Sequence, residues 1–343
     1  MSLPTPLLLS GAPGSPYTRK MLAVMRYRHI PYKVLWGLND QPENLPAPKV
    51  HLLPTFYLPK ASGELEAVVD SSPLIRRFEK EFDGRTIIPS DPALAFLDHL
   101  LEDYGDEWLT KAMFHYRWYY QDDIERAGDV LPRWRGISAP ESDLLAAKKM
   151  FSERQISRLY VVGSNDTTAP IIEASYARFL DIFQEHLKSY PYLMGNRPGS
   201  SDFAAYGQLT QLSHFDPTPM ALTLEKAPRV YAWVDLVDDL SGANPSENDW
   251  LSREDAKSTL RPLFEELGRT FVPVMLANAQ ALMSKAEKVE TTVDGATWVQ
   301  QPFPYQGKCV QWLREAYQTL SADDRAYVDD VLSGTGCEPL VGA

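Results

Sequence analysis

The chain has 343 residues, of which 44% are hydrophobic and 23% are charged, with 34 lysines and arginines against 46 aspartates and glutamates. These fractions are typical of globular proteins and argue against disordered, collagen-like and coiled-coil chains, and the length predicts two or three domains. The net charge of −12 repels polyanions and therefore disfavours a nucleic-acid partner. Residues 1–83 differ, because ten basic and eight acidic side chains give them a net charge of +2.

The first 83 residues predict a compact α/β unit in the order β-α-β followed by β-β-α. Strands are expected over residues 7–9, 32–35, 55–58 and 66–69, and helices from Pro16 onward and over 72–82. The pair Ser15-Pro16 is typical of a helix start. Serine accepts a hydrogen bond from a free first-turn amide, and proline lacks the amide that would stay unpaired there.

From residue 93 onward the pattern becomes helical. Phe96, Leu100 and Tyr104 recur at helical spacing, and similar apolar stripes continue along the chain. An all-helical second domain is therefore predicted over residues 93–240. After a linker, residues 250–343 predict at least two more helices, so that 241–343 form a helical extension packed on the second domain.

Cysteine content and hydropathy bear on where the protein resides. Cys309 and Cys337 are too few for a disulfide framework or a zinc site built from cysteine pairs. No basic leader and no run of 18 apolar residues occurs in the sequence. We therefore expect a cytoplasmic protein that does not cross a membrane.

The common catalytic signatures are absent from this sequence. It contains no glycine-rich dinucleotide motif, Walker loop, paired-histidine zinc motif or G-x-S-x-G nucleophile turn. The six histidines are scattered without ligand spacing and are interpreted as structural. No metal or prosthetic group is predicted.

Three segments of the first domain, taken together and in order, resemble the glutathione transferase superfamily. They are SPYTRK at 15–20, LLPTFYL at 52–58 and VVDSSPLIRRFEKEF at 68–82. The resemblance covers about residues 1–240 and is closest to the serine-type, cytosolic members. It implies a thioredoxin-like α/β N-terminal domain with a mixed four-stranded sheet, followed by an all-α C-terminal domain. The long C-terminal extension has no counterpart in the familiar two-domain members.

Ser15 is the candidate catalytic residue that the resemblance implies. In serine-type members, the hydroxyl of the matching Ser-Pro-aromatic segment donates a hydrogen bond to the sulfur of glutathione. Such a bond favours the thiolate, which is the nucleophile. Tyr17 and Ser10 are the local alternatives for this contact, and Ser15 would also serve as an ordinary helix cap.

Four further residues are expected to bind glutathione. By resemblance, Leu53 precedes the family's cis-proline, Pro54, and pairs through its main chain with the cysteinyl part of the ligand. Asp70 and Ser71 begin the next helix, where a serine hydroxyl and first-turn amides can hold the γ-glutamyl carboxylate. The Asp70 carboxylate would pair with the ammonium, although the family usually has the longer Glu or Gln here. A plain turn proline and a plain helix cap are the alternative interpretations.

The aromatic segment TKAMFHYRWYYQDDIERAG at 110–128 has two interpretations. Its aromatic side chains can pack between helices, which is the more ordinary role. Alternatively, His115, Tyr116, Trp118 and Tyr119 line the cleft for an apolar electrophile, since members of the family recruit that side of the site from this helix.

The function predicted from these observations is a glutathione transferase of the transferase or lyase type, acting on a small hydrophobic electrophile. Glutathione would be a cosubstrate, and the resemblance implies a homodimer. A transferase-like binding or interaction module without turnover is the alternative, because the three segments specify a fold as much as a reaction. Reductive or peroxidase chemistry on the same scaffold is a third possibility.

Overall fold

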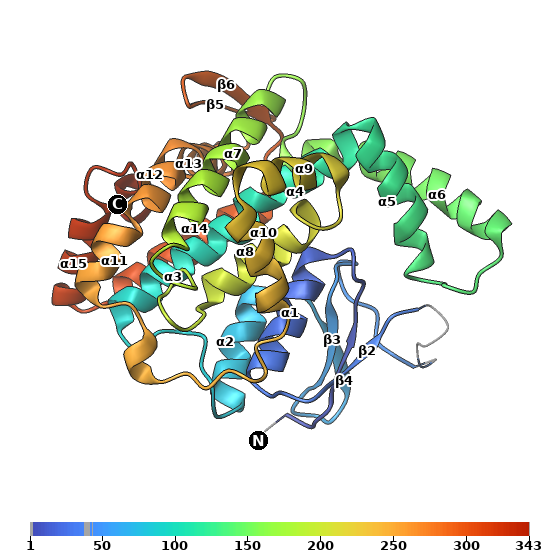
Figure 1. Cartoon of the computed structure of the whole chain (residues 1–343), viewed down its shortest axis with the longest axis horizontal. Helices are drawn as coiled ribbons and strands as arrows, with labels where there is room; N and C mark the ends of the chain where they lie inside the picture. The colour runs from blue at the N-terminus through green and yellow to red at the C-terminus, as the bar shows by residue number, and fades with distance from the viewer. Residues whose placement is uncertain (1–2, 38–41, 43, 343) are drawn as a thin grey trace.

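The computed structural model describes residues 3–37, 42 and 44–342 of the chain. Its N-terminal part contains a four-stranded sheet in the order β2-β1-β3-β4 (Figure 1). The strands are β1 (Leu7–Ser10), β2 (Tyr32–Leu35), β3 (Thr55–Pro59) and β4 (Leu65–Val68). β1 is parallel to β2 and antiparallel to β3, which in turn is antiparallel to β4. The predicted mixed four-stranded sheet is therefore confirmed.

Two helices, α1 (Pro16–Tyr27) and α2 (Ser71–Glu81), separate this sheet from the rest of the molecule (Figure 1). Apolar side chains of the strands pack against them. Phe56 of β3 is fully buried and meets Phe78 of α2 edge-on, with ring centroids 5.5 Å apart. This core holds α1 and α2 on the sheet and so fixes where their N-termini lie.

The helical domain is built around a long helical run and a central buried helix. The run consists of α3 (Pro92–Tyr104), a π-helical turn (Gly105–Leu109) and α4 (Thr110–Tyr119). Every residue of α8 (Ser200–Leu212) is buried. It crosses α1 so closely that a Cβ on Gly207 would lie 2.6 Å from the carbonyl oxygen of Pro16. Only glycine permits this approach.

The remaining helices complete the all-helical domain that the sequence predicts. They are α5 (Gln121–Arg133), α6 (Glu141–Ile156), α7 (Ala169–His186), α9 (Pro217–Lys226) and α10 (Pro228–Asp238), with a 3-10 turn at Leu159–Val162. α5 and α6 pack on each other and project from the body of the molecule, at the right of Figure 1. Within the described residues, no helix combines the length and the apolar character needed to cross a membrane.

The C-terminal extension continues the helical domain and shares its core. Its helices are α11 (Arg253–Thr259), α12 (Arg261–Arg269), α13 (Phe271–Ser284), α14 (Pro304–Thr319), α15 (Ala322–Leu332) and α16 (Glu338–Val341), with a 3-10 turn at Glu247–Asp249. α14 and α15 pack on α3, and α12 packs on α7. Leu313 and Val331 are fully buried in one apolar cluster with side chains of α3 and α8. The expected extra helices are therefore confirmed.

The extension also contains a β-hairpin that is not expected from the sequence analysis. β5 (Val289–Val293) and β6 (Ala296–Gln300) pair antiparallel, and the side chain of Trp298 in β6 is fully buried. The connecting residues Asp294 and Gly295 both have positive φ. An Asp-Gly pair between β-prone runs is a strong signal for such a tight turn, and it was present in the sequence.

Candidate functional site

The residues expected to bind glutathione in the first domain meet at one edge of the sheet. β3 and β4 pair so that Phe56 faces Val68. Two residues further along, Pro54 and Asp70 therefore leave the sheet at the same edge. The loop that carries Ser15 follows β1, and because β1 is antiparallel to β3, this loop also leaves from that edge.

Ser15 caps α1 and joins two loops at this edge. Its Oγ accepts a hydrogen bond from the Thr18 amide at 3.2 Å and donates one to the Leu53 carbonyl at 3.1 Å. The Leu53-Pro54 peptide bond is cis. Among the described residues, none accepts a hydrogen bond from the Leu53 amide. The capping role and the proposed binding role thus use the same hydroxyl, and Ser15 and Leu53 are in direct contact.

The two alternatives to Ser15 are engaged elsewhere in the fold. The Tyr17 hydroxyl donates a hydrogen bond to the main-chain carbonyl of Asp106 at 2.7 Å. Burial and the nearby Glu107 carboxyl raise the pKa of Tyr17 well above its usual value. The Ser10 hydroxyl lies 3.1 Å from that of Tyr57, in a buried contact between β1 and β3. The Ser15 hydroxyl also has a partner, the Leu53 carbonyl, but that carbonyl belongs to the main chain expected to bind the ligand, and this position favours Ser15 as the hydroxyl that meets the ligand.

Asp70 and Ser71 stand at the N-terminus of α2. Asp70 has a φ of 88°, a conformation that costs energy for any residue except glycine and that concentrates at functional sites. Its Oδ1 accepts a hydrogen bond from the Tyr305 hydroxyl at 2.7 Å. The buried Ser71 Oγ accepts one from the Lys20 ammonium at 3.4 Å. Burial raises the pKa of Asp70, and the hydrogen bond from Tyr305 opposes that rise.

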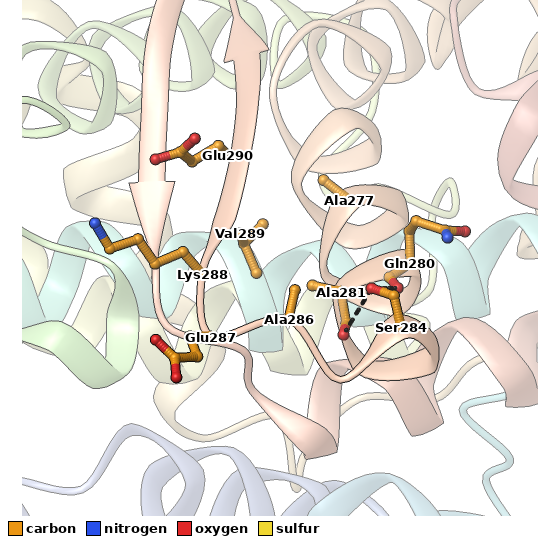
Figure 2. Close-up of a pocket in the computed structure, with 9 residues that line it drawn as sticks. All are labelled: Ala277, Gln280, Ala281, Ser284, Ala286, Glu287, Lys288, Val289 and Glu290. Carbon is orange, nitrogen blue, oxygen red and sulfur yellow. Dashed lines mark hydrogen bonds between the residues drawn. The ribbon is translucent and has the colours of Figure 1, made fainter.

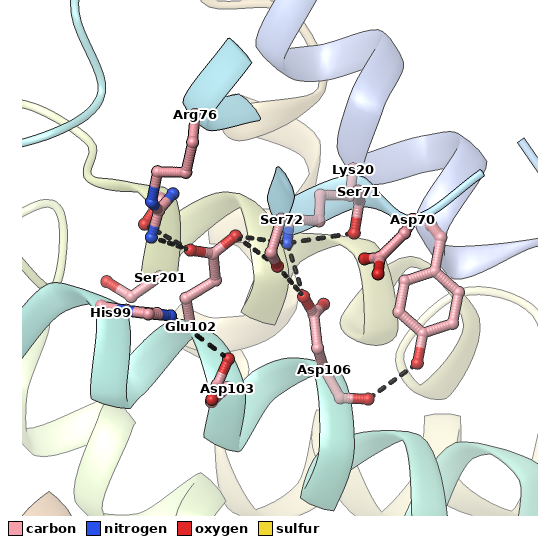
Figure 3. Close-up of polar contacts among 12 residues, drawn as sticks. Lys20, Asp70, Ser71, Ser72, Arg76, His99, Glu102, Asp103, Asp106 and Ser201 are labelled. Atoms are coloured by element: carbon pink, nitrogen blue, oxygen red, sulfur yellow. Dashed lines mark hydrogen bonds and ion pairs between the residues drawn. The ribbon is translucent and has the colours of Figure 1, made fainter. Parts of the chain in front are cut away.

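A buried set of polar side chains lies beneath the N-terminus of α2, where the two domains meet (Figure 3). We call it the junction network, and it comprises Lys20, Ser72, Arg76, Glu102 and Asp106. The Lys20 ammonium lies 2.7 Å from Glu102 Oε1 and 2.6 Å from Asp106 Oδ2. The Ser72 hydroxyl shares its proton between the same two carboxylates, at 2.9 Å from Glu102 and 3.2 Å from Asp106, and Arg76 pairs with the second oxygen of Glu102 at 2.6 Å.

The two carboxyl groups of the junction network titrate differently. Burial favours the neutral form of Glu102, but Arg76 and Lys20 outweigh burial and lower its pKa. Burial and the neighbouring Glu102 carboxylate together raise the pKa of Asp106 to about 6, against the opposing effect of Lys20. Because such charges are isolated from water, the network is stable only while its cations and anions stay paired.

The π-helical turn next to this network is held from two sides. π-Helical turns widen the backbone and are frequent at functional sites. The carbonyl of Asp106 accepts the hydrogen bond from Tyr17 of α1. The carbonyl of Glu107 lies 3.5 Å from the side-chain amide of Gln306 in α14. The N-terminal domain and the extension therefore meet at this turn.

The four aromatic residues predicted to line the electrophile cleft lie on α4. His115, Tyr116 and Trp118 are buried, and both ring nitrogens of His115 pair with polar side chains, at 2.8 and 3.1 Å. Tyr119 is 36% exposed and donates a hydrogen bond to Asp166. Among the described residues, the hydrogen bonds and ring contacts of all four stay inside the helical domain. This arrangement matches the packing interpretation, and a role in the cleft stays a prediction.

Other residues of the helical domain do reach the loop before Ser15, and the sequence analysis missed them. A Cβ on Gly14 would meet Leu131 at 2.3 Å and Trp134 at 2.9 Å, so both side chains lie against this loop. Arg117 donates a hydrogen bond to the Gly14 carbonyl at 2.9 Å. No local pattern marks these side chains, because the contacts join positions about a hundred residues apart.

A surface depression of about 720 Å³ lies elsewhere, between α13 and β5 (Figure 2). Its lining consists of Ala277, Gln280, Ala281, Ser284, Ala286, Glu287, Lys288, Val289 and Glu290. This lining offers no aromatic surface and no cysteine or histidine, and it lies in the extension far from the sheet (Figure 1). We therefore place the candidate site at the sheet edge.

Comparisons with known proteins match two segments of the chain. The family description "Glutathione S-transferase, N-terminal domain" matches residues 9–86, and "Glutathione S-transferase, C-terminal domain" matches residues 151–237. No curated protein matches the chain.

Solved structures resemble the chain distantly. A glutathione transferase family member from Pseudomonas fluorescens with two glutathione bound is 14% identical, with 68% of this chain and 89% of that chain covered and a TM-score of 0.41. A glutathione transferase from Burkholderia graminis, also with two glutathione molecules bound per subunit, is 16% identical, with 68% and 85% covered and a TM-score of 0.44. A Tau class glutathione S-transferase from mango, Mangifera indica, is 17% identical, with 73% and 94% covered and a TM-score of 0.39.

The family assignment rests on the two domain matches, since every one of these TM-scores is below 0.5. The matched domains follow each other in the family's order, and the first covers all the glutathione-binding residues expected from the sequence. By its N-terminal and C-terminal domains, the chain belongs to the glutathione transferase superfamily.

Proposed function

We propose that this chain is a glutathione-dependent enzyme of the transferase or lyase type. Ser15 stabilises the thiolate of bound glutathione, and Leu53 with Pro54 holds the cysteinyl main chain. Asp70 and Ser71 bind the γ-glutamyl end. The thiolate then attacks a small hydrophobic electrophile, forming a carbon–sulfur bond as a leaving group departs or a double bond is consumed.

The observation that carries this proposal is the position of the Ser15 hydroxyl. It lies at the N-terminus of α1 and donates to the carbonyl of Leu53, beside an amide with no acceptor among the described residues. A cysteinyl main chain bound along Leu53 would bring its sulfur toward this hydroxyl and the Tyr17 amide, which has no acceptor among the described residues. When the Ser15 hydroxyl turns its single proton from the Leu53 carbonyl to the sulfur, the donor that a thiolate needs is next to the main-chain groups that hold the peptide.

The interactions proposed at Ser15 are strong enough to lower the pKa of the glutathione thiol. A thiol with a pKa of about 8.5 is only a few per cent ionised at pH 7, and lowering that pKa by ~2 units requires about 2.7 kcal/mol. A hydrogen bond to a charged group contributes about 1.5–3 kcal/mol, and a helix N-terminus adds ~0.3–1 kcal/mol. No metal is needed for this step.

For the electrophile we propose a position beside Leu131 and Trp134. Both side chains lie against the loop that precedes Ser15, on the side of the helical domain. An apolar group bound there would be next to the sulfur. The sequence also predicts that residues of α4 line the electrophile site. That prediction requires an opening from the interior of the helical domain to the sheet edge, because it concerns His115, Tyr116, Trp118 and Tyr119.

The test is glutathione binding by calorimetry, combined with the ultraviolet absorbance of the bound thiolate, in the wild type and in Ser15→Ala. We expect millimolar or tighter binding by the wild type and a roughly tenfold smaller thiolate fraction in the variant. Ser321→Ala is the matched control, because Ser321 caps α15 through the same kind of bond, to the Asp324 amide at 3.1 Å. Wild-type protein that binds no glutathione at millimolar concentration would exclude the enzyme.

The homodimer and the cytoplasmic location stay proposals of the same kind. The resemblance implies the first, and the low cysteine content favours the second. Light scattering coupled to size-exclusion chromatography would measure the mass of the particle in solution. A monomer at micromolar concentration would contradict the homodimer.

A further inference from the structure

One side chain of the C-terminal extension reaches the γ-glutamyl end of the proposed site. The Tyr305 hydroxyl donates a hydrogen bond to Asp70 Oδ1 at 2.7 Å, across 235 positions of sequence. Nothing in the resemblance or in the matched domains accounts for this contact, since the two matches end at residues 86 and 237.

The extension is built so that Tyr305 is held in place. Just before it, the main chain of Phe303 exchanges two hydrogen bonds with the side-chain amide of the fully buried Asn278: the Phe303 amide donates at 2.7 Å and its carbonyl accepts at 2.9 Å. Just after it, the side chain of the buried Gln306 lies 3.5 Å from the carbonyl of Glu107 in the π-helical turn. With a fixed residue on either side, the Tyr305 ring has little freedom to leave Asp70.

The next turns of α14 are anchored as well. Cys309, Val310 and Leu313 are all buried, so the face of the helix that carries Tyr305 is packed against the protein. The Tyr305 ring also meets Trp312 edge-on, with centroids 6.1 Å apart. A side chain that is held by its main chain, its helix and a neighbouring ring can orient the group it bonds.

The hydrogen bond from Tyr305 orients the carboxyl group of Asp70 and affects its charge. The Asp70 backbone has the strained φ of 88°, and burial raises the pKa of its carboxyl group. A carboxylate can accept about four hydrogen bonds, so the one from Tyr305 leaves capacity for an ammonium group. The hydrogen bond from Tyr305 also favours the ionised form, which is the form that binds a cation.

We propose that Tyr305 is a positioning residue for the γ-glutamyl end of glutathione, acting through Asp70. Its hydroxyl orients the carboxylate toward the ligand ammonium, so that the extension completes a binding site that the first domain begins. This inference rests on the proposed function, namely that the chain binds glutathione. It also assigns a specificity: thiols with a free γ-glutamyl ammonium are preferred over those without one.

The experiment compares Tyr305→Phe with the wild type in calorimetric titrations against two ligands. One is glutathione, and the other is its analogue with a glutaryl group in place of the γ-glutamyl group, which keeps the carboxylate and lacks the ammonium. The matched control is Tyr317→Phe. Tyr317 is a partly buried residue about three turns further along the same helix, and it donates the same kind of bond to Asp329 at 2.6 Å.

We expect Tyr305→Phe to raise the Kd for glutathione about tenfold and to change the Kd for the glutaryl analogue less than twofold. Tyr317→Phe should change neither. An equal loss for both ligands, or no loss for either, would overturn the inference while wild-type binding shows that the proposed function stands. Failure of the wild type to bind glutathione would instead overturn the proposed function and this inference together.

Discussion

The junction network and the aromatic cluster of α4 are two buried regions of the helical run that begins at Pro92, and they differ in what they connect. The junction network joins side chains of α1, α2, α3 and the π-helical turn through ion pairs and serine hydroxyls. The rings of α4 contact Tyr120, which directly precedes α5, and rings of α6 and α7, and they stay within one domain. The first region therefore crosses the domain boundary, and the second does not.

The difference between these two regions distinguishes a packed interior from a candidate binding site. The density of aromatic residues on α4 suggests a ligand cleft, yet their contacts are those of a packed interior. The polar residues of the junction network are inconspicuous in the sequence, yet Lys20 bonds Ser71, the neighbour of the strained Asp70, which in turn accepts the hydrogen bond from Tyr305. Contacts between distant segments mark the candidate site more clearly than residue type does.

The largest effect is expected from Lys20→Met, which breaks the junction network. The change leaves the buried Glu102 and Asp106 without the ammonium that pairs with both. Breaking a buried ion pair in this way costs about 3–5 kcal/mol of the free energy of unfolding. Urea denaturation followed by circular dichroism would measure it. Lys33→Met on β2 is the control, since Lys33 is exposed, and it should change stability by less than about 0.5 kcal/mol.

A loss below about 1 kcal/mol in Lys20→Met would contradict the view that the junction network depends on paired charges. The double variant Lys20→Met, Asp106→Asn sharpens the test. It removes the carboxylate that Lys20→Met leaves without a cation, while Glu102 keeps its pair with Arg76, so we expect it to be more stable than Lys20→Met alone.

A smaller effect is expected from Trp118→Phe, which tests the aromatic cluster of α4. Trp118 is 2% exposed and packs against Phe114 and Phe151. Loss of part of the indole leaves a small cavity that costs about 1–2 kcal/mol of stability, while the Kd for glutathione should change less than twofold. The half-exposed Tyr119 provides a control, since Tyr119→Phe should have little effect on either quantity. A tenfold change in Kd for Trp118→Phe would show that this helix belongs to the binding site.

The smallest expected effect is a shift in the pH dependence of glutathione binding, which tests Asp70 at the N-terminus of α2, above the junction network. Asp70 must be ionised to pair with an ammonium, and burial raises its pKa. Binding of glutathione should therefore weaken as the pH falls through this raised pKa, at a higher pH than for an ordinary aspartate. Tyr305→Phe removes an interaction that lowers the pKa, so its binding should begin to weaken at a still higher pH.

Other charged and titratable groups also face Asp70. Comparing Tyr305→Phe with the wild type distinguishes their effect on the pH dependence from that of Tyr305. The other groups are Lys20, Glu102, Glu107 and Cys309. Burial raises the pKa of Glu107 to about 8 and also raises that of Cys309, so both are largely neutral in acid solution. These groups are the same in the wild type and in Tyr305→Phe. Identical pH profiles for glutathione binding in the two proteins would contradict a role of Tyr305 in the ionisation of Asp70.

Local sequence signals predict much of this structure. The four strands and the two helices of the first domain lie within one or two residues of their predicted positions. The predicted cap at Ser15 is present as well, because a helix cap depends on neighbouring residues alone. The hairpin of the extension was missed, although its Asp294-Gly295 turn is a local signal of the same kind. The two residues of this turn are adjacent in the sequence, so the sequence alone was sufficient to predict the hairpin.

The parts that escaped prediction depend on contacts between distant residues. The sequence by itself determined the order of the elements, because this order follows from periodicity and turn chemistry, and the resemblance of three segments indicated the family. Only the tertiary structure decided that Lys20 pairs with two buried carboxylates, that the rings of α4 point into their own domain and that Tyr305 reaches Asp70. Such contacts arise from how helices pack in three dimensions, and no local pattern encodes which partner a side chain meets after 235 intervening positions.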